Sequence, residues 1–159
     1  MYRRIFYFLA LQLVCIQTFA QDENREIAEQ IVEIANEAYY NLRVLIVANE
    51  QYVQAADTDT TYLEANFMAG KTYLESNFKS RATQYLVRVY QIDPQYKFNI
   101  LYLIGRAHQY GGEFERAIRY YNQYLSQLIS NPEYRGTDYT SREEVERRIY
   151  ECNNGIEYK

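Results

Sequence analysis

Apolar residues recur along most of the chain at the three-and-four spacing of an α-helix. The first such set is Ile27, Ile31, Ile34, Ala35 and Ala38, and this spacing places its members on one helix face. The same periodicity returns over residues 44–56, 62–75, 80–92, 98–110, 114–129 and 143–150. No run alternates convincingly between apolar and polar residues, as a half-buried strand would. The pattern therefore predicts an all-α protein.

Turn-forming residues separate the helical segments. Residues 57–61 are wholly polar, and residues 130–140 form the longest irregular stretch. Asp93-Pro94 should end a helix, because the residue before a proline avoids the helical region. Gly111-Gly112 predicts a tight turn, since glycine adopts conformations closed to other residues. These breaks divide the chain into seven helices, which we expect to form three hairpins and a closing helix.

Two of the helices carry a start signal. Thr61 with Glu64, and Ser141 with Glu144, have the spacing of a capping box. In a capping box the hydroxyl and the carboxylate each accept a hydrogen bond from a backbone N–H of the first turn. We expect such a box at the start of both helices.

An internal repeat underlies the helical pattern. Gly70 and Ala82 recur as Gly105 and Ala117, each 35 residues later. A period in this range, with small residues at fixed places, is typical of stacked helical hairpins. Such arrays present extended concave binding surfaces, so the repeat favours a binding function.

The first 20 residues have the layout of a secretory signal peptide. Two arginines, Arg3 and Arg4, precede an apolar run over residues 5–14, and a small-x-small cleavage site ends at Ala20. A membrane span is the alternative, but the run is shorter than the roughly 20 residues that a bilayer needs. A lipid anchor on Cys15 is a third possibility, although Val14 occupies the place of the usual small residue. We expect removal of residues 1–20 and a periplasmic location, with membrane attachment only if Cys15 is lipidated.

Charge and cysteine content narrow the function further. The chain has 17 basic and 21 acidic residues, and both basic residues of the first 20 leave with the signal peptide. The processed chain then carries a net charge of −6, which disfavours nucleic acid as a partner. Cys152 is left as a single cysteine, so no internal disulfide can form. The 19 tyrosines suit helix packing and interfaces alike.

The repeat resembles the tetratricopeptide repeat, a helical hairpin of about 34 residues. The repeat over 63–96 carries Ala69-Gly70, Tyr73, Ala82, Leu86, Val89 and Pro94. The repeat over 98–131 carries Ile104-Gly105, His108, Gly112, Phe114, Ala117, Tyr121 and Tyr124. A weaker repeat over 29–62 carries Tyr39, Ala48, Tyr52 and Ala55, with Asn36 at the usual glycine and Thr60 at the usual proline. Residues 141–153 resemble a capping helix. The resemblance implies a right-handed solenoid over residues 21–159.

A narrower resemblance concerns the order of these parts. A signal peptide, tyrosine-rich repeats and a helix ending in residues 148–155 resemble the N-terminal region of periplasmic proteins of Bacteroidota. In those proteins the repeats precede a β-propeller and an OmpA-like domain that binds peptidoglycan, and some accompany the type IX secretion system. The resemblance does not extend to the propeller, so peptidoglycan binding is not carried over. A truncated form and a stand-alone relative both stay open.

Three segments suggest chemistry at first sight. Residues 68–72 end like a phosphate-binding loop, but the first glycine of that motif is replaced by Ala65 and the segment is helical. His108 is the single histidine, at a place where the repeat needs a packing aromatic residue. Residues 57–61 lack the glycine and the glutamate of a calcium loop. We therefore expect no enzyme, no metal, no cofactor and no small-molecule substrate.

The resemblance also implies a binding groove. The repeat positions that line it correspond to Gln30, Glu33, Glu37, Tyr40, Asn41, Glu64, Phe67, Lys71, Leu74, Glu75, Asn99, Tyr102, Arg106, Gln109 and Tyr110. We expect the contacts to come from Tyr40, Asn41, Phe67, Lys71, Tyr102, Arg106 and Tyr110. The set lacks the Lys/Asn/Arg clamp with which some relatives hold a C-terminal carboxylate, and Glu33 and Glu37 would repel one. We predict an envelope scaffold that binds a protein segment. The alternative is a structural spacer of a larger envelope protein, with no ligand of its own.

Overall fold

The computed structural model describes residues 21–157, and none of them lies in a β-strand. A helix over residues 21–36 continues into a short π-helix, η1 (Glu37–Asn41). The following elements are α2 (Leu45–Thr58), α3 (Leu63–Glu75), a 3-10 turn η2 (Lys79–Arg81), α4 (Ala82–Ile92), α5 (Ile100–Tyr110), α6 (Phe114–Ser130) and α7 (Arg142–Glu157). With η1 counted as the end of the first helix and η2 as the start of α4, these are the seven predicted helices.

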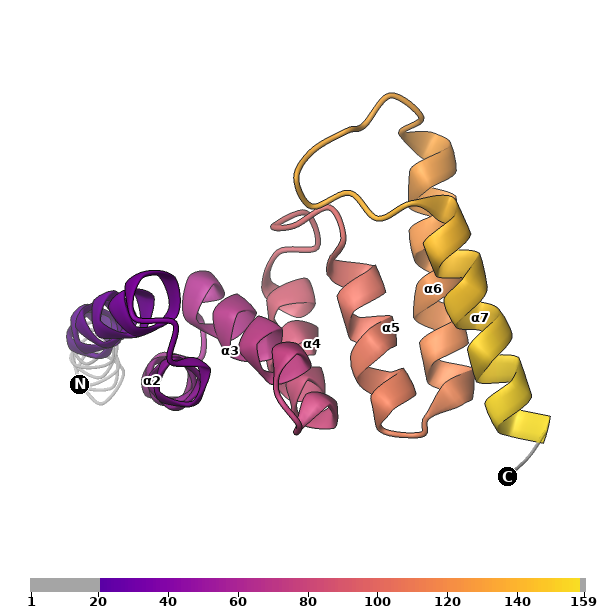
Figure 1. The fold of residues 1–159 in the computed structure, drawn as a ribbon. Coiled ribbons are helices and arrows are strands. Elements are labelled where there is room, and N and C mark those ends of the chain that lie inside the picture. Colours follow the sequence, from indigo (N-terminus) through magenta and orange to yellow (C-terminus); the bar gives the residue numbers. More distant parts are fainter. Residues whose placement is uncertain (1–20, 158–159) are drawn as a thin grey trace, which may run out of the picture.

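The helices stand side by side in chain order (Figure 1). The first helix pairs with α2, α3 pairs with α4, and α5 pairs with α6, while α7 packs against α6. This order of short antiparallel connections gives the three predicted hairpins and a closing helix. The closing helix extends to Glu157, beyond its expected end at residue 153.

Close approach within the hairpins explains the repeated glycines. A Cβ atom added at Gly70 would lie 2.5 Å from Leu86, and one added at Gly105 would lie 2.5 Å from the Tyr121 ring. Both distances are far below van der Waals contact, so only glycine allows the two helices to pack this closely. The repeat spacing of 35 residues therefore reflects a packing requirement that recurs in successive hairpins.

The first hairpin meets the same requirement with a polar pair. Asn36 stands at the glycine position, and its Oδ1 accepts a 2.6 Å hydrogen bond from the Tyr52 hydroxyl. Tyr52 is fully buried, so this bond satisfies its hydroxyl inside the hairpin. The departure from the repeat pattern at residue 36 is thus compensated within the same hairpin.

The helix interfaces bury two apolar clusters. One lies between the first helix, α2 and α3 and is rich in alanine. The other lies between α3, α4, α5, α6 and α7 and contains the fully buried rings of Tyr121 and Tyr124. Small residues in the first cluster bring backbones together, and large residues in the second fill wider gaps. The described chain is therefore held by neighbour-to-neighbour packing, as in other solenoids.

The predicted capping box at Thr61 and Glu64 is wrong. The N-cap of α3 is Tyr62, which makes no side-chain capping bond. Thr61 instead donates from both its N–H and its hydroxyl to Asp59 Oδ1, at 2.8 and 2.7 Å. Asp59 also pairs with Arg25 of the first helix at 2.5 Å. The ion pair with Arg25 fixes Asp59, and Asp59 accepts the hydrogen bonds of Thr61. Thr61 therefore does not cap α3, in contrast to the prediction from the sequence.

The second box forms in part. The N–H of Glu144 donates to the Ser141 hydroxyl at 3.3 Å. The Glu144 carboxylate does not turn back to the helix start, because Tyr102, Arg147 and Arg148 donate to it. Long-range partners again outcompete the local pattern.

The other predicted breaks are confirmed. Helix α4 ends at Ile92, with Asp93 as its extended C-cap before Pro94. Gly112 has a φ of 72° and completes the α5–α6 turn. Arg43 also lies in the left-handed region, with a φ of 58°, and it reverses the chain between η1 and α2.

The residues that suggested chemistry in the sequence are used in the packing of the fold. Residues 68–72 lie inside α3, where the backbone amides are used by the helix. His108 is buried, stacks on Tyr120 at 5.3 Å and lies 3.1 Å from the Glu113 carboxylate. Burial lowers its pKa despite the nearby carboxylate. Cys152 is a free, buried thiol.

Residues 21–157 lack both a metal-binding cluster and a membrane-spanning helix. Within them no group of three or more histidine, cysteine or acidic residues is placed to hold a metal ion. Across the same described range, no helix has the length and apolar character needed to cross a membrane. The predicted signal peptide and Cys15 lie outside the described residues.

Candidate interaction groove

The inner faces of α3 and α5 meet at a hollow of about 290 Å³. Its lining consists of Phe67, Lys71, Leu74, Glu75, Lys97, Asn99, Leu103, Arg106, Thr137 and Asp138. Three of the seven predicted contact residues, Phe67, Lys71 and Arg106, are therefore brought together. They come from two successive repeats, so the groove crosses the boundary between hairpins.

The long loop after α6 forms one wall of the hollow. Asp138 of this loop accepts a 2.6 Å hydrogen bond from the Phe98 N–H, at the start of α5. The Tyr134 ring stacks on the Phe98 ring at 3.8 Å, and its hydroxyl donates to Asp138. In Figure 1 the loop reaches from the end of α6 back over the α4–α5 connection. Thr137 and Asp138 are thus fixed at the hollow.

Each basic residue of the hollow lies over aromatic rings. Lys71 Nζ is 5.2 Å from the centre of the Tyr39 ring. Lys97 Nζ is 5.4 Å from the centre of the Phe67 ring. A ring attracts a cation through its electron-rich face and fixes the side chain in place. The positive groups are therefore held near the hollow without being neutralised.

Arg106 is held in the same way by two tyrosines. Its guanidinium carbon is 5.9 Å from the centre of the Tyr102 ring and 5.8 Å from that of Tyr110. Burial alone would raise the pKa of Tyr110, but hydrogen bonding and charge from Arg106 and Arg148 lower it. Two guanidinium groups therefore act on the Tyr110 hydroxyl.

Within residues 21–157, none of the three cations Lys71, Lys97 and Arg106 has a carboxylate within ion-pair distance. In the same described range, Arg106 Nε and Asn99 Oδ1 are buried side-chain atoms without a hydrogen-bond partner. Buried polar atoms are nearly always paired in folded proteins. The three cations thus give the hollow positive charge to offer to a ligand.

The two acidic residues of the hollow are already engaged. The Tyr39 hydroxyl donates to Glu75 at 2.9 Å, and burial together with this bond raises the pKa of Tyr39 to about 12. Asp138 accepts from Phe98 and Tyr134. Burial alone would raise the pKa of Asp138, but these hydrogen bonds and the nearby charge of Lys97 lower it. Asp138 therefore serves to fix the loop.

The predicted contacts Tyr40 and Asn41 lie on η1, outside the lining of the hollow. Tyr40 is half exposed and packs edge-on against Tyr39, with ring centres 4.8 Å apart. Asn41 donates to Glu37 in its own helix turn. Both side chains are accessible, and the structure connects them to the hollow only through Tyr39.

The predicted contacts Tyr102 and Tyr110 differ from each other in exposure. Tyr102 is 7% exposed, and its hydroxyl donates to Glu144 of α7 at 3.0 Å. Tyr110 is 43% exposed. The closing helix therefore covers the inner face of α5 at Tyr102, which leaves Tyr110 as the accessible ring of this pair.

Sequence reasoning missed four residues that line the hollow, namely Lys97, Leu103, Thr137 and Asp138, and it also missed the role of Tyr39 beside it. Tyr39 was assigned to packing, although it carries the cation–π contact of Lys71. Lys97 precedes the repeat frame that begins at Phe98, and Thr137 lies in an irregular loop. The signal that could have identified Lys97 is its position between two aromatic residues, Tyr96 and Phe98. No local pattern indicates where the long loop folds.

Comparison with known proteins agrees with this architecture. No protein-family model matches the chain, and no curated protein sequence matches it significantly. Among solved structures, the chain is similar to the Sgt2 TPR domain from Aspergillus fumigatus, with a TM-score of 0.57 and 15% identity, over 82% of this chain and 79% of that one. It is also similar to MamA, with a TM-score of 0.53 and 18% identity, over 82% of this chain and 79% of that one.

The chain therefore folds as a solenoid of tetratricopeptide repeats. The identities are too low to carry more than the fold.

Proposed function

We propose that this protein is a non-enzymatic scaffold of the bacterial envelope that holds a segment of a partner protein in the groove between α3 and α5. The observation that carries the proposal is the set of three cations, Lys71, Lys97 and Arg106, which face one hollow and, in the described chain, have no carboxylate within ion-pair distance. A cation held on a ring and left unpaired favours an acidic group from outside.

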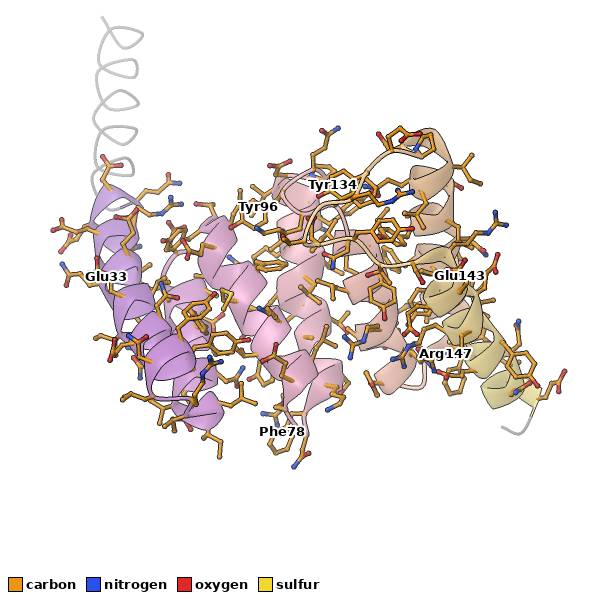
Figure 2. The ribbon with its side chains drawn as sticks, turned by 45° about the horizontal axis from the view of Figure 1, so that its top comes forward. Glu33, Phe78, Tyr96, Tyr134, Glu143 and Arg147 are labelled. Carbon is orange, nitrogen blue, oxygen red and sulfur yellow. The ribbon has the colours of Figure 1, made fainter. Side chains whose placement is uncertain are left out.

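The lining specifies the segment more closely. Phe67 and Leu103 offer apolar surface beside the cations, so an apolar side chain next to an acidic one fits the hollow. Glu33 lies on the first helix (Figure 2), Glu37 lies in η1, and neither lines the hollow. Their charge disfavours an acidic residue at that end and favours a basic or neutral one. The partner segment should therefore run with its acidic part toward α5.

The envelope setting rests on the sequence. The basic, apolar and small-residue regions of residues 1–20 follow the order of a secretory signal. The order of export signal, tyrosine-rich repeats and closing helix resembles envelope proteins of Bacteroidota, including companions of the type IX secretion system. We propose a periplasmic location on these grounds. A spacer in a larger envelope protein is the second candidate, because the resemblance places the repeats before further domains.

A selection from a random peptide library displayed on phage tests the groove. The purified protein should enrich peptides that place Asp or Glu beside an apolar residue. Lys71→Gln with Arg106→Gln should weaken the selected peptides about tenfold or more, since each charged contact contributes about 1.5–3 kcal/mol. The matched control is Arg116→Gln with Arg119→Gln, which removes the same charge from two residues of α6 that lie outside the lining of the hollow.

Equal loss of peptide binding in the control pair would contradict a specific groove. Enrichment of nothing beyond the background of an unrelated protein would favour the spacer. The size and fraction of the native protein test the setting separately. An antibody against the processed chain should detect it in the periplasmic fraction. A band near 19.1 kDa less the signal peptide indicates a stand-alone scaffold, and a much larger band indicates a module of a longer protein.

A further inference from the structure

Exposed apolar side chains gather at the turns within the hairpins. The first two of these turns lie at residues 42–44 and 76–81, and we call them, together with Leu45 and Ile46 at the start of α2, the turn edge. In this edge Leu42 is 63% exposed, Ile46 is 74% exposed and Phe78 is 59% exposed. Phe78 points away from the body of the solenoid in Figure 2. Large apolar side chains exposed together indicate an interaction surface.

The two turns form one continuous surface. Ile46, at the start of α2, and Phe78, in the second turn, both belong to the lining of one hollow of about 410 Å³. The contact continues to the third turn, because Lys79 lies over the Tyr110 ring with 5.5 Å to its centre. The apolar positions are therefore neighbours in space, although more than 30 residues separate them in the chain.

The charge of the turn edge is opposite to that of the chain. The whole protein has a net charge of −4. Between Glu37 and Glu50 the single charged residue is Arg43, and between Glu75 and Arg88 the charged residues are Lys79 and Arg81. In residues 21–157, none of Arg43, Lys79 and Arg81 has a carboxylate within ion-pair distance. The turn edge thus carries three basic residues and no acidic one, and the nearest acidic residues, Glu50 and Glu75, lie in the hollow between the two turns.

The first turn has a basic residue at a position whose backbone conformation favours glycine. Arg43 has a φ of 58°, a region that a residue with a side chain enters at a cost. The turn is nevertheless fixed by a 2.9 Å hydrogen bond from the Val44 N–H to the Ala38 carbonyl. The hydrogen-bonded turn therefore holds Arg43 in this conformation. In the chain, Arg43 lies between Leu42 and Val44, whose side chains are exposed.

We propose that the turn edge binds the surface of an anionic lipid bilayer. Leu42, Ile46 and Phe78 enter the head-group region, and the three basic side chains of the edge meet lipid phosphates. Apolar side chains beside Lys and Arg are the combination that holds proteins on a membrane surface without crossing it. The long stems of Arg43, Lys79 and Arg81 can lie along the apolar layer while their charges stay at the phosphates.

The charges near the turn edge disfavour two other occupants, a second copy of the chain and an acidic protein segment. A second copy joined by twofold symmetry would place the same basic patch against itself, and like charges would face each other. An acidic protein segment seated in the hollow would pass Glu50 and Glu75, which line it. A bilayer surface meets the tips of the turns, where the exposed charges are all positive.

Sedimentation with lipid vesicles tests the proposal on recombinant protein that carries no lipid. The protein should sediment with vesicles of phosphatidylcholine and phosphatidylglycerol and not with phosphatidylcholine alone. Binding should weaken as salt is raised, because salt screens exposed charges. Phe78→Ser should reduce the partition coefficient about tenfold or more. Lys79→Gln with Arg81→Gln should reduce it roughly thirtyfold, from about 1 kcal/mol for each basic residue.

Ile129→Ser is the matched control, because Ile129 is 70% exposed on α6 and lies outside the turn edge. This variant should bind vesicles as the unchanged protein does. Equal loss in Ile129→Ser and Phe78→Ser, binding that ignores lipid charge, or no binding to any vesicle would each overturn the proposal. Reversible self-association of the unchanged protein that Phe78→Ser abolishes would also overturn it, in favour of a second copy.

The turn edge and the groove can be separated experimentally. The groove pair Lys71→Gln and Arg106→Gln should keep vesicle binding, and Phe78→Ser should keep peptide binding. Far-UV circular dichroism of every variant controls for folding. Phe78 is exposed, so its replacement should leave the thermal unfolding midpoint nearly unchanged. If one of the two proposals fails in these experiments, the other is still tested independently.

Discussion

Replacing Gly105 by alanine gives a direct measurement of the packing that the repeat encodes. The new Cβ would lie 2.5 Å from Tyr121 Cε1 and 2.6 Å from Cδ1. The ring cannot move away easily, because it is fully buried and its hydroxyl donates to Gln109 at 2.7 Å. Either the ring leaves its position and breaks this bond, or α5 and α6 separate.

The two energetic effects of the substitution oppose each other. Alanine in a helix interior is more stable than glycine by about 1 kcal/mol. Overpacking a well-filled core costs about 1–3 kcal/mol, and the short distance to a fixed ring places this site near the upper end. We expect Gly105→Ala to lower the free energy of unfolding by about 1–2 kcal/mol. Urea unfolding followed by far-UV circular dichroism measures this change.

Gly111→Ala is the matched control, at the end of the same helix. Gly111 has a φ of −83°, and a Cβ there would have its nearest neighbour at 3.4 Å, in ordinary contact. We expect this variant to be unchanged or more stable by up to about 1 kcal/mol. If Gly105→Ala were as stable as Gly111→Ala, the helices could separate freely, and the packing account of the repeat would be refuted.

Two further predictions concern α7. Burial alone would raise the pKa of Glu144, but hydrogen bonds from Arg147, Arg148 and Tyr102 lower it to about 2. Because the unfolded pKa is about 4.3, this stabilisation is present above that value and is lost as the pH falls toward 2. Glu144→Gln should therefore cost about 1–3 kcal/mol at neutral pH and show a smaller loss between about pH 5 and 2 in urea titrations; an unchanged pH profile would contradict this. Burial raises the pKa of the Cys152 thiol to about 11, so a thiol reagent at pH 8 should label it only after unfolding by urea, and rapid labelling of the folded protein would contradict its buried position.

The closing helix connects stability with the groove. Glu144 holds Tyr102, and Tyr102 lies beside Arg106. A change in α7 can therefore alter the position of a groove cation without touching the hollow. Loss of peptide binding in Glu144→Gln would be an indirect effect, and the groove variants remain the test of direct contact.

The amino-acid sequence by itself determined the helical class, the hairpin order and the places where glycine is required. These features depend on local periodicity and on small residues at fixed spacing, such as Gly70 and Gly105. Three groove residues, Phe67, Lys71 and Arg106, also followed from their repeat positions, since equivalent positions of successive repeats face the same side. The identity of the partner and the cellular location stay predictions.

Tertiary structure alone decided how the groove is completed and what surrounds it. Asp138 meets Phe98 across 40 residues, and Glu144 meets Tyr102 across 42. These contacts depend on the path of an irregular loop and on how α7 seats against α5 and α6, which a local pattern does not encode. The same reason explains the failed capping box, where Arg25 holds Asp59 and Asp59 takes Thr61. It also explains the turn edge, because Ile46 and Phe78 become neighbours only when the hairpins stack.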